Sequence, residues 1–175
     1  MTSLLPVSLA DIDRRLLVLA RTRGHGPRRE WAARTYSRAG EHAACWLALG
    51  AAGAVVDGCR RTRWLRGAAV VAGAYGLNFA VKLAVRRRRP VLADLPALSP
   101  VVSGLSFPSA HATTSFAAAT AYRGLVPGAP LYAAAAAFAV SRPYLGVHYP
   151  SDVLVGAALG TALALAAPGG EPACR

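Results

Sequence analysis

The chain reads SRPYLGVHYPSD at residues 141–152, between two apolar runs at residues 131–140 and 153–167. Arginine, histidine and aspartate at the ends of membrane-type helices are costly there and are usually functional. His148 and Asp152 are four residues apart, so a helix that begins just before Asp152 lets the two side chains approach each other. A carboxylate that accepts one ring N–H of a histidine makes the other ring nitrogen a better nucleophile. The stretch indicates either a reactive histidine or a surface His–Asp pair beside a snorkelling arginine.

The composition combines strong apolarity with strong basicity. Of the 175 residues, 54% are hydrophobic, yet the formal net charge is +12. Lys82 is the only lysine, and the arginines cluster between apolar runs, which is typical of a membrane protein with charged helix ends. Nucleic-acid binding is the competing interpretation of the charge, but no zinc-finger or aromatic-basic RNA motif is present. We therefore expect one membrane domain and no nucleic-acid partner.

The cysteines and the first residues exclude two further classes. Cys45, Cys59 and Cys174 are odd in number and lack C-x-x-C spacing, so they predict neither a disulfide framework nor a zinc site. The first ten residues contain no basic segment, and we expect no cleavable signal peptide.

Two short helices are expected before the apolar part of the chain. Residues 8–21 begin with a serine that Asp11 follows at capping-box spacing, and leucines recur at helical intervals. Arginines interrupt this pattern, so the helix is predicted to lie in the membrane interface rather than to span. Residues 28–38 carry Trp31 and Tyr36, which suit the headgroup region, although a soluble surface helix is equally compatible.

Five apolar segments follow, rich in alanine and glycine, and some are shorter than the ~20 residues of an isolated span. Small residues such as Gly156 and Gly160 allow such helices to associate closely. The sequence predicts an all-α integral membrane bundle of about five transmembrane helices, with a plasma-membrane location. The expected parts are an amphipathic interfacial region at 1–41, a membrane-embedded domain at 42–168 and a short tail at 169–175. The apolar segments are residues 42–56, 64–85, 109–125, 129–140 and 151–167.

In this order, the ends of the second and fourth segments and the starts of the third and fifth lie on one side of the membrane. Lys82 and Arg89 flank one of these ends and are seven residues apart, so a continuing helix would place both on one face. Pro90 predicts a helix end. The arginines at residues 86–88 are expected to contact lipid headgroups. Snorkelling is the alternative for Lys82.

Residues 107–111 read FPSAH and begin the third apolar segment. Free backbone N–H groups at a helix start favour an anion, and Ser109 can add a hydroxyl donor. His111 lies in the first turn, where a capping or packing histidine is the alternative. Arg142 adds a fork-shaped donor that suits phosphate oxygens.

Together, these stretches resemble the three signature motifs of the type-2 phosphatidic acid phosphatase superfamily, which also includes acid phosphatases and vanadium haloperoxidases. The resemblance spans residues 82–152, about 40% of the chain, with the order and spacing of the motifs intact. One departure is Ala110, which stands where the family usually has glycine. Alanine keeps the backbone N–H, and its methyl group is tolerated where φ is negative. The motif positions are matched by Lys82, Arg89 and Pro90, by Pro108, Ser109 and His111, and by Ser141, Arg142, His148 and Asp152.

The resemblance implies a phosphatase in which His148 attacks phosphorus and forms a phosphohistidine, while Asp152 orients it. His111 would protonate the leaving oxygen and then activate water. Cations and a helix start supply charge stabilisation without a metal, and no Asp/Glu cluster suited to Mg²⁺ is present, so no metal or cofactor is expected. The residues implied to hold the phosphate are Lys82, Arg89, Ser109, Ala110 through its N–H, and Arg142.

A site at the edge of a membrane bundle favours a lipid phosphate, with membrane lipids as neighbours. The small size, the amphipathic start and the Ala/Arg-rich composition resemble the actinobacterial decaprenylphosphoryl-5-phosphoribose phosphatases. Undecaprenyl diphosphate, phosphatidylglycerophosphate and phosphatidic acid stay open as substrates, as do a haloperoxidase and a silent membrane scaffold as classes. The oligomeric state and the roles of Glu41 and His42 also stay open.

Charge counting gives a hypothesis for orientation. The first forty residues carry eight arginines against three acids and are expected on the same side as the site. Positive residues near segment ends are retained in the cytoplasm, so the active site is predicted to face the cytoplasm.

Overall fold

The computed structural model describes residues 8–167, which form seven α-helices and two short 3-10 helices and contain no β-strand. The all-α prediction is therefore confirmed, and the five apolar segments correspond to α3 to α7. The predicted tail at residues 169–175, with Cys174, lies outside the described residues. The elements are α1 (Leu9–Thr22), α2 (Pro27–Ala39), η1 (Glu41–Ala43), α3 (Ala44–Val56), η2 (Gly58–Arg60), α4 (Arg61–Val85), α5 (Ala110–Tyr122), α6 (Gly128–Tyr144) and α7 (Pro150–Ala166).

Helix α1 begins where the capping box predicts. Ser8 Oγ accepts a hydrogen bond from the Asp11 N–H, and the Asp11 carboxylate accepts one from the Ser8 N–H, at 3.2 and 3.1 Å. Along one side of the helix, Leu9, Ile12 and Leu16 are exposed. This apolar strip on a basic helix fits the expected place in the membrane interface.

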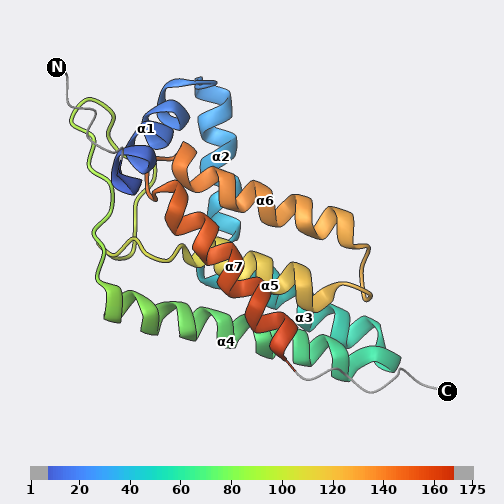
Figure 1. Ribbon diagram of the computed structural model, residues 1–175. Coiled ribbons are helices and arrows are strands. Elements are labelled where there is room, and N and C mark those ends of the chain that lie inside the picture. Colours follow the sequence, from blue (N-terminus) through green and yellow to red (C-terminus); the bar gives the residue numbers. More distant parts are fainter. Residues whose placement is uncertain (1–7, 168–175) are drawn as a thin grey trace.

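Helix α5 lies at the centre of the bundle, among α4, α6 and α7 (Figure 1). It consists largely of alanine, threonine and serine and is buried along most of its length. Helix α7 approaches it through two glycines. A Cβ added at Gly160 would lie 2.0 Å from the Thr113 carbonyl oxygen, and one added at Gly156 would lie 2.7 Å from that of Ser109. The predicted close packing through these small residues is confirmed.

Aromatic side chains fill the other end of the bundle. The Tyr122 side chain lies against Gly50 of α3 and Gly67 of α4, where an added Cβ would lie 2.3 Å from its hydroxyl oxygen and 2.4 Å from its ring. Its hydroxyl donates to the Trp46 carbonyl oxygen at 3.0 Å. Tyr122 therefore ties α5 to both neighbouring helices.

Length and apolar composition single out one described helical stretch, Gly58–Val85 with 28 residues, as able to cross a bilayer by itself. The pair Pro27–Ala39 and Glu41–Val56 passes the same test together, but it is bent by 49°. Helix α7 is apolar and shorter. A central helix such as α5 contacts neighbouring helices rather than lipid, so it needs no long apolar sequence.

The predicted segment end at residue 85 agrees with the end of α4, but a helix that continues to Pro90 does not form. Helix α4 stops at Val85 because Arg86 is left-handed with φ 53°, and the following residues are extended. The Ser106 N–H donates to the Arg87 carbonyl oxygen at 2.7 Å, and this pairing replaces helical hydrogen bonds. The prediction that Lys82 and Arg89 share a helical face is therefore incorrect. Helix α6, expected to end at residue 140, continues to Tyr144 and includes Arg142 in its last turn.

Candidate active site

The end of α6 and the start of α7 lie beside α1 and α2, at the same end of the bundle as the start of α5 (Figure 1). A cavity of about 120 Å³ opens there. Six of the predicted site residues line it, although they come from five separate parts of the chain. These residues are Lys82, Arg89, Ala110, His111, Arg142 and His148.

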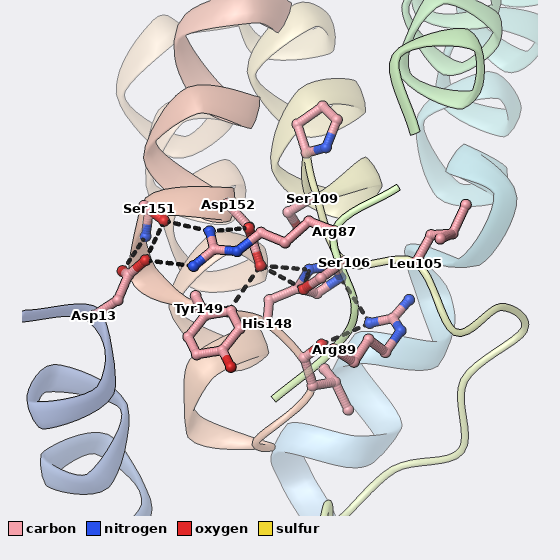
Figure 2. A network of polar contacts seen from close by, with 12 residues as sticks. Asp13, Arg87, Arg89, Leu105, Ser106, Ser109, His148, Tyr149, Ser151 and Asp152 are labelled. Carbon is pink, nitrogen blue, oxygen red and sulfur yellow. Dashed lines mark hydrogen bonds and ion pairs between the residues drawn. The ribbon is translucent and has the colours of Figure 1, made fainter. Parts of the chain in front are cut away.

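His148 is 2% exposed and contacts charged groups through both ring nitrogens (Figure 2). Its Nε2 lies 3.0 Å from Nη1 of Arg89, and its Nδ1 lies 3.5 Å from Oδ2 of Asp152. A guanidinium only donates, so Nε2 accepts and the ring proton is on Nδ1. Burial lowers the pKa of His148 to about 3, which keeps the imidazole neutral near pH 7. Neutral Nε2 can therefore act as a nucleophile.

Asp152 is fully buried in the first turn of α7, and the predicted approach to His148 is confirmed. Its Oδ2 also accepts from Ser106 Oγ at 2.5 Å and from the Tyr149 N–H at 2.9 Å. The Ser106 hydroxyl lies 3.3 Å from His148 Nδ1, so it bridges the aspartate and the histidine. No sequence signal pointed to Ser106, which precedes the second motif.

Lys82 is buried and does not snorkel. Its Nζ donates to the carbonyl oxygens of Pro108 at 2.7 Å and Ser106 at 3.2 Å. Arg89 is held in a similar way, because its Nε donates to the Ser103 carbonyl oxygen at 2.7 Å and its Nη1 to that of Val147 at 2.6 Å. Backbone oxygens thus fix two cations at the wall of the cavity.

Ser37, near the end of α2, contacts two further residues that line the cavity. His111 Nε2 donates to the Ser37 carbonyl oxygen at 2.9 Å, and Arg142 Nη1 donates to the Ser37 hydroxyl. Arg142 is 5% exposed, and its buried Nε has no protein partner among the described residues. That N–H is available to a ligand oxygen. Ser37 was not predicted, because it lies in a polar helix with no motif.

The second motif is only partly in the cavity. Ala110 lines it and lies in the helical first turn of α5, and its φ is not positive, so the methyl group causes no backbone strain. Ser109 is fully buried and lies outside the cavity wall. Its N–H donates to the Asp152 carbonyl oxygen at 2.9 Å, and its Oγ has no partner among the described residues.

The prediction that Arg87 contacts lipid headgroups is wrong, because its side chain points into the protein. Its Nη1 donates to Asp152 Oδ1 and its Nη2 to Asp13 Oδ2, both at 2.8 Å (Figure 2). Arg86 and Arg88 are exposed, as expected. In extended backbone, alternate side chains point to opposite sides, which turns Arg87 and Arg89 toward the site.

A polar rim formed by Glu41, His42 and Tyr75 also lines the cavity. The Tyr75 hydroxyl lies 2.8 Å from His42 Nδ1. His42 and Ala43 have φ values of 53° and 61°, and two consecutive left-handed residues other than glycine are strained. Such strain is found mainly at functional sites.

Comparison with known proteins agrees with these motifs. The sequence pattern of the PAP2 superfamily matches residues 63–171, which is more than half of the chain. The chain belongs to the PAP2 superfamily. It is also 46% identical over 132 residues to decaprenylphosphoryl-5-phosphoribose phosphatase of Mycobacterium tuberculosis, a match that covers 73% of this chain and 72% of the relative. The protein of the same name from Mycolicibacterium smegmatis is 46% identical over 129 residues and covers 71% and 69%.

Two solved structures share the fold. Aquifex aeolicus LpxE has a TM-score of 0.74 and 22% identity, over 88% of this chain and 93% of that one. The PAP2-type phosphatidylglycerolphosphate phosphatase of Bacillus subtilis has a TM-score of 0.72 and 24% identity, over 89% and 82%. The family and the named relatives together identify this PAP2 member as a phosphatase. Within residues 8–167, no group of three or more His, Cys, Asp or Glu side chains could hold a metal ion.

Proposed function

We propose that this PAP2 member is a plasma-membrane phosphatase that removes the terminal phosphate of decaprenylphosphoryl-5-phosphoribose. One observation carries the proposal: His148 and three cationic side chains, Lys82, Arg89 and Arg142, line one cavity in a chain 46% identical to proteins named for that substrate. The five helices α3 to α7 are proposed to form the membrane bundle, with α1 in the interface on the side of the site.

In the proposed reaction, His148 Nε2 attacks phosphorus as the bond to the sugar oxygen breaks. His111 donates a proton to that oxygen, and the product alcohol leaves. Water then attacks the phosphohistidine and gives a proton to His111, which releases inorganic phosphate and restores His148. Arg89 now contacts Nε2, so its guanidinium is already placed to bind a phosphate oxygen as the P–N bond forms.

The charge on the phosphate is balanced by protein cations in this proposal. Lys82, Arg89 and Arg142 supply three positive charges, and the start of α5 at Ala110 adds backbone dipoles. Phosphoryl transfer needs mainly positioning and charge stabilisation, so the proposed reaction uses no metal.

The walls of the cavity support a lipid with a polar headgroup. Phe79 of α4 and Val102 of the following loop line the cavity and are 54% and 83% exposed, which offers apolar contacts to a prenyl chain that enters from the membrane. The rim of Glu41, His42 and Tyr75 offers hydrogen-bond partners to sugar hydroxyls. A diacylglycerol phosphate has no sugar hydroxyls to bind at this rim.

The test is phosphate release by the purified protein from four lipid phosphates in one detergent. We expect the highest kcat/KM for decaprenylphosphoryl-5-phosphoribose, over undecaprenyl diphosphate, phosphatidylglycerophosphate and phosphatidic acid. A preference for another member would refute the substrate, and no turnover of any member would refute the phosphatase. His42→Ala serves as the matched variant. It should lower kcat/KM for decaprenylphosphoryl-5-phosphoribose, while kcat/KM for phosphatidic acid changes little.

A further inference from the structure

Asp152 needs a cationic partner, because the imidazole of His148 is neutral near pH 7. It is fully buried, and its two oxygens have separate roles, since Oδ2 lies toward His148 and Ser106 while Oδ1 accepts from Arg87 at 2.8 Å. A buried carboxylate without a cation is costly, and it becomes protonated or rotates instead. Either change would remove the acceptor that holds the ring proton of His148 on Nδ1.

The guanidinium group of Arg87 is itself held in a fixed orientation by several contacts. Its second nitrogen, Nη2, donates to Asp13 Oδ2 at 2.8 Å, and Nη1 also donates to Ser151 Oγ at 2.7 Å. The guanidinium carbon lies 4.2 Å above the centre of the Tyr149 ring. Two carboxylates and a stacked ring together fix both the position and the orientation of the fork.

Asp13 brings α1 into this arrangement. Asp13 is 6% exposed. Its Oδ1 accepts from the Ser151 N–H at 2.9 Å, and its Oδ2 accepts from Ser151 Oγ as well as from Arg87. Ser151 lies in the first turn of α7, directly before Asp152. Asp13 therefore holds Arg87 and the start of α7 at once, although α1 is remote in the sequence (Figure 2).

Arg87 does not line the cavity, and the Asp152 carboxylate lies between it and His148. It cannot contact a phosphate in the site without displacing Asp152. Whatever it contributes to the reaction must pass through that carboxylate.

We propose that Arg87, held by Asp13 of α1, is a positioning residue that keeps the Asp152 carboxylate aligned on His148. The role rests on the proposed function only in that His148 is the nucleophile. It makes the interfacial helix α1 part of the support of the active site.

The kinetic test compares Arg87→Met with Arg88→Met, which removes an exposed arginine of the same run. Hydrolysis of para-nitrophenyl phosphate is measured, because this probe reports the chemistry without lipid recognition. We expect Arg87→Met to lower kcat about 10- to 100-fold with KM within about threefold, the loss that a small misplacement of a reacting group causes. Arg88→Met should stay within about twofold of the parent. Equal kcat in all three proteins would overturn the proposal.

Two further variants separate positioning from folding. Arg87→Lys keeps the charge but reaches one carboxylate, so its kcat should lie between those of the parent and Arg87→Met. Asp13→Asn combined with Arg87→Met should be no slower than Arg87→Met alone, because Asp13 is proposed to act through Arg87. Full additivity of the two losses would contradict that coupling.

A spectroscopic test is independent of turnover. In protein with ¹⁵N-labelled histidine, the ring of His148 should show a protonated Nδ1 and a bare Nε2 in the parent and in Arg88→Met. Arg87→Met, or Asp13→Asn if Arg87→Met does not fold, should give a mixture of tautomers. An unchanged tautomer would overturn the positioning role. If no phosphate ester is hydrolysed by the parent, the proposed function fails, and this measurement still decides the role of Arg87.

Discussion

Nη1 of Arg89 lies 3.0 Å from Nε2 of His148, so a cationic side chain donates a hydrogen bond to the nitrogen that is proposed to attack phosphorus. Because Arg89 is also bonded to the Val147 carbonyl oxygen through the same nitrogen, its place beside the ring is fixed. A phosphate that enters the cavity would take over this donor as Nε2 begins to bond to phosphorus. The contact thus protects the lone pair of a buried neutral histidine and places a positive charge at the point of attack.

Chelation should leave the enzyme active. Because charge stabilisation is assigned to Lys82, Arg89 and Arg142, we expect full phosphate release in excess EDTA and inhibition by vanadate, which mimics the five-coordinate state. Phosphate release with and without EDTA checks this. Activity that is lost to EDTA and restored by Mg²⁺ would refute the metal-free mechanism.

Ala110→Gly should be tolerated. Ala110 lies in the first turn of α5 and lines the cavity, and glycine at this position keeps both the helical conformation and the backbone N–H. We expect kcat/KM within about tenfold of the parent, which is ~1.4 kcal/mol of barrier. A larger loss would show that the alanine methyl group contributes to packing in the site.

The stabilising effect of Asp13 should depend on pH. Burial raises the pKa of Asp13, but hydrogen bonds from Arg87 and Ser151 outweigh burial, so the net pKa is lowered. A lowered folded-state pKa adds stability above the unfolded value near 4, and this stability is lost as pH falls through the folded value. Asp13→Asn should lower the free energy of unfolding at pH 7 by about 1–3 kcal/mol, and this loss should appear as a lower Tm. The difference in Tm from the parent should shrink below pH ~4, and a constant difference would contradict the ion pair.

Only some of the features behind these predictions could be predicted from the sequence. Residues of a short motif are recognised by their separation in the sequence, so His148 and Asp152 could be paired because they are four residues apart. Arg87 and Asp13 are 74 residues apart, and no local pattern distinguishes Arg87 from the exposed arginines beside it. The Lys82 and Arg89 prediction failed because one left-handed residue ends the helix between them.

The number of spans was likewise not decided by the sequence. Helices that face other helices need less apolar length than helices that face lipid, so apolar runs alone do not count spans. Only Gly58–Val85 meets the length and composition test by itself among the described residues. The five-span bundle therefore remains a proposal for α3 to α7.

Orientation can be tested at residue 99. Arg21 donates to the Pro96 carbonyl oxygen at 2.8 Å, which places α1 beside the loop that carries Ser99. Because the arginine-rich first forty residues are expected in the cytoplasm, we predict that Ser99→Cys resists a membrane-impermeant thiol reagent in intact cells, with the native cysteines replaced. Permeabilised cells provide the labelling control. Labelling of intact cells would place the site outside.

The proposed nucleophile can be tested most directly by trapping the intermediate. His111→Ala should slow phosphate release from a lipid substrate by about 10²–10⁴-fold, the usual contribution of a general acid and base. An aryl phosphate with a good leaving group needs no proton donor, so this variant should form the phosphoenzyme quickly and hydrolyse it slowly. We predict acid-labile phosphate on the peptide that contains His148, detected by mass spectrometry after rapid quenching, and none after His148→Ala. Near-normal turnover by His148→Ala, or a quenched His111→Ala enzyme without phosphate on His148, would contradict the phosphohistidine mechanism.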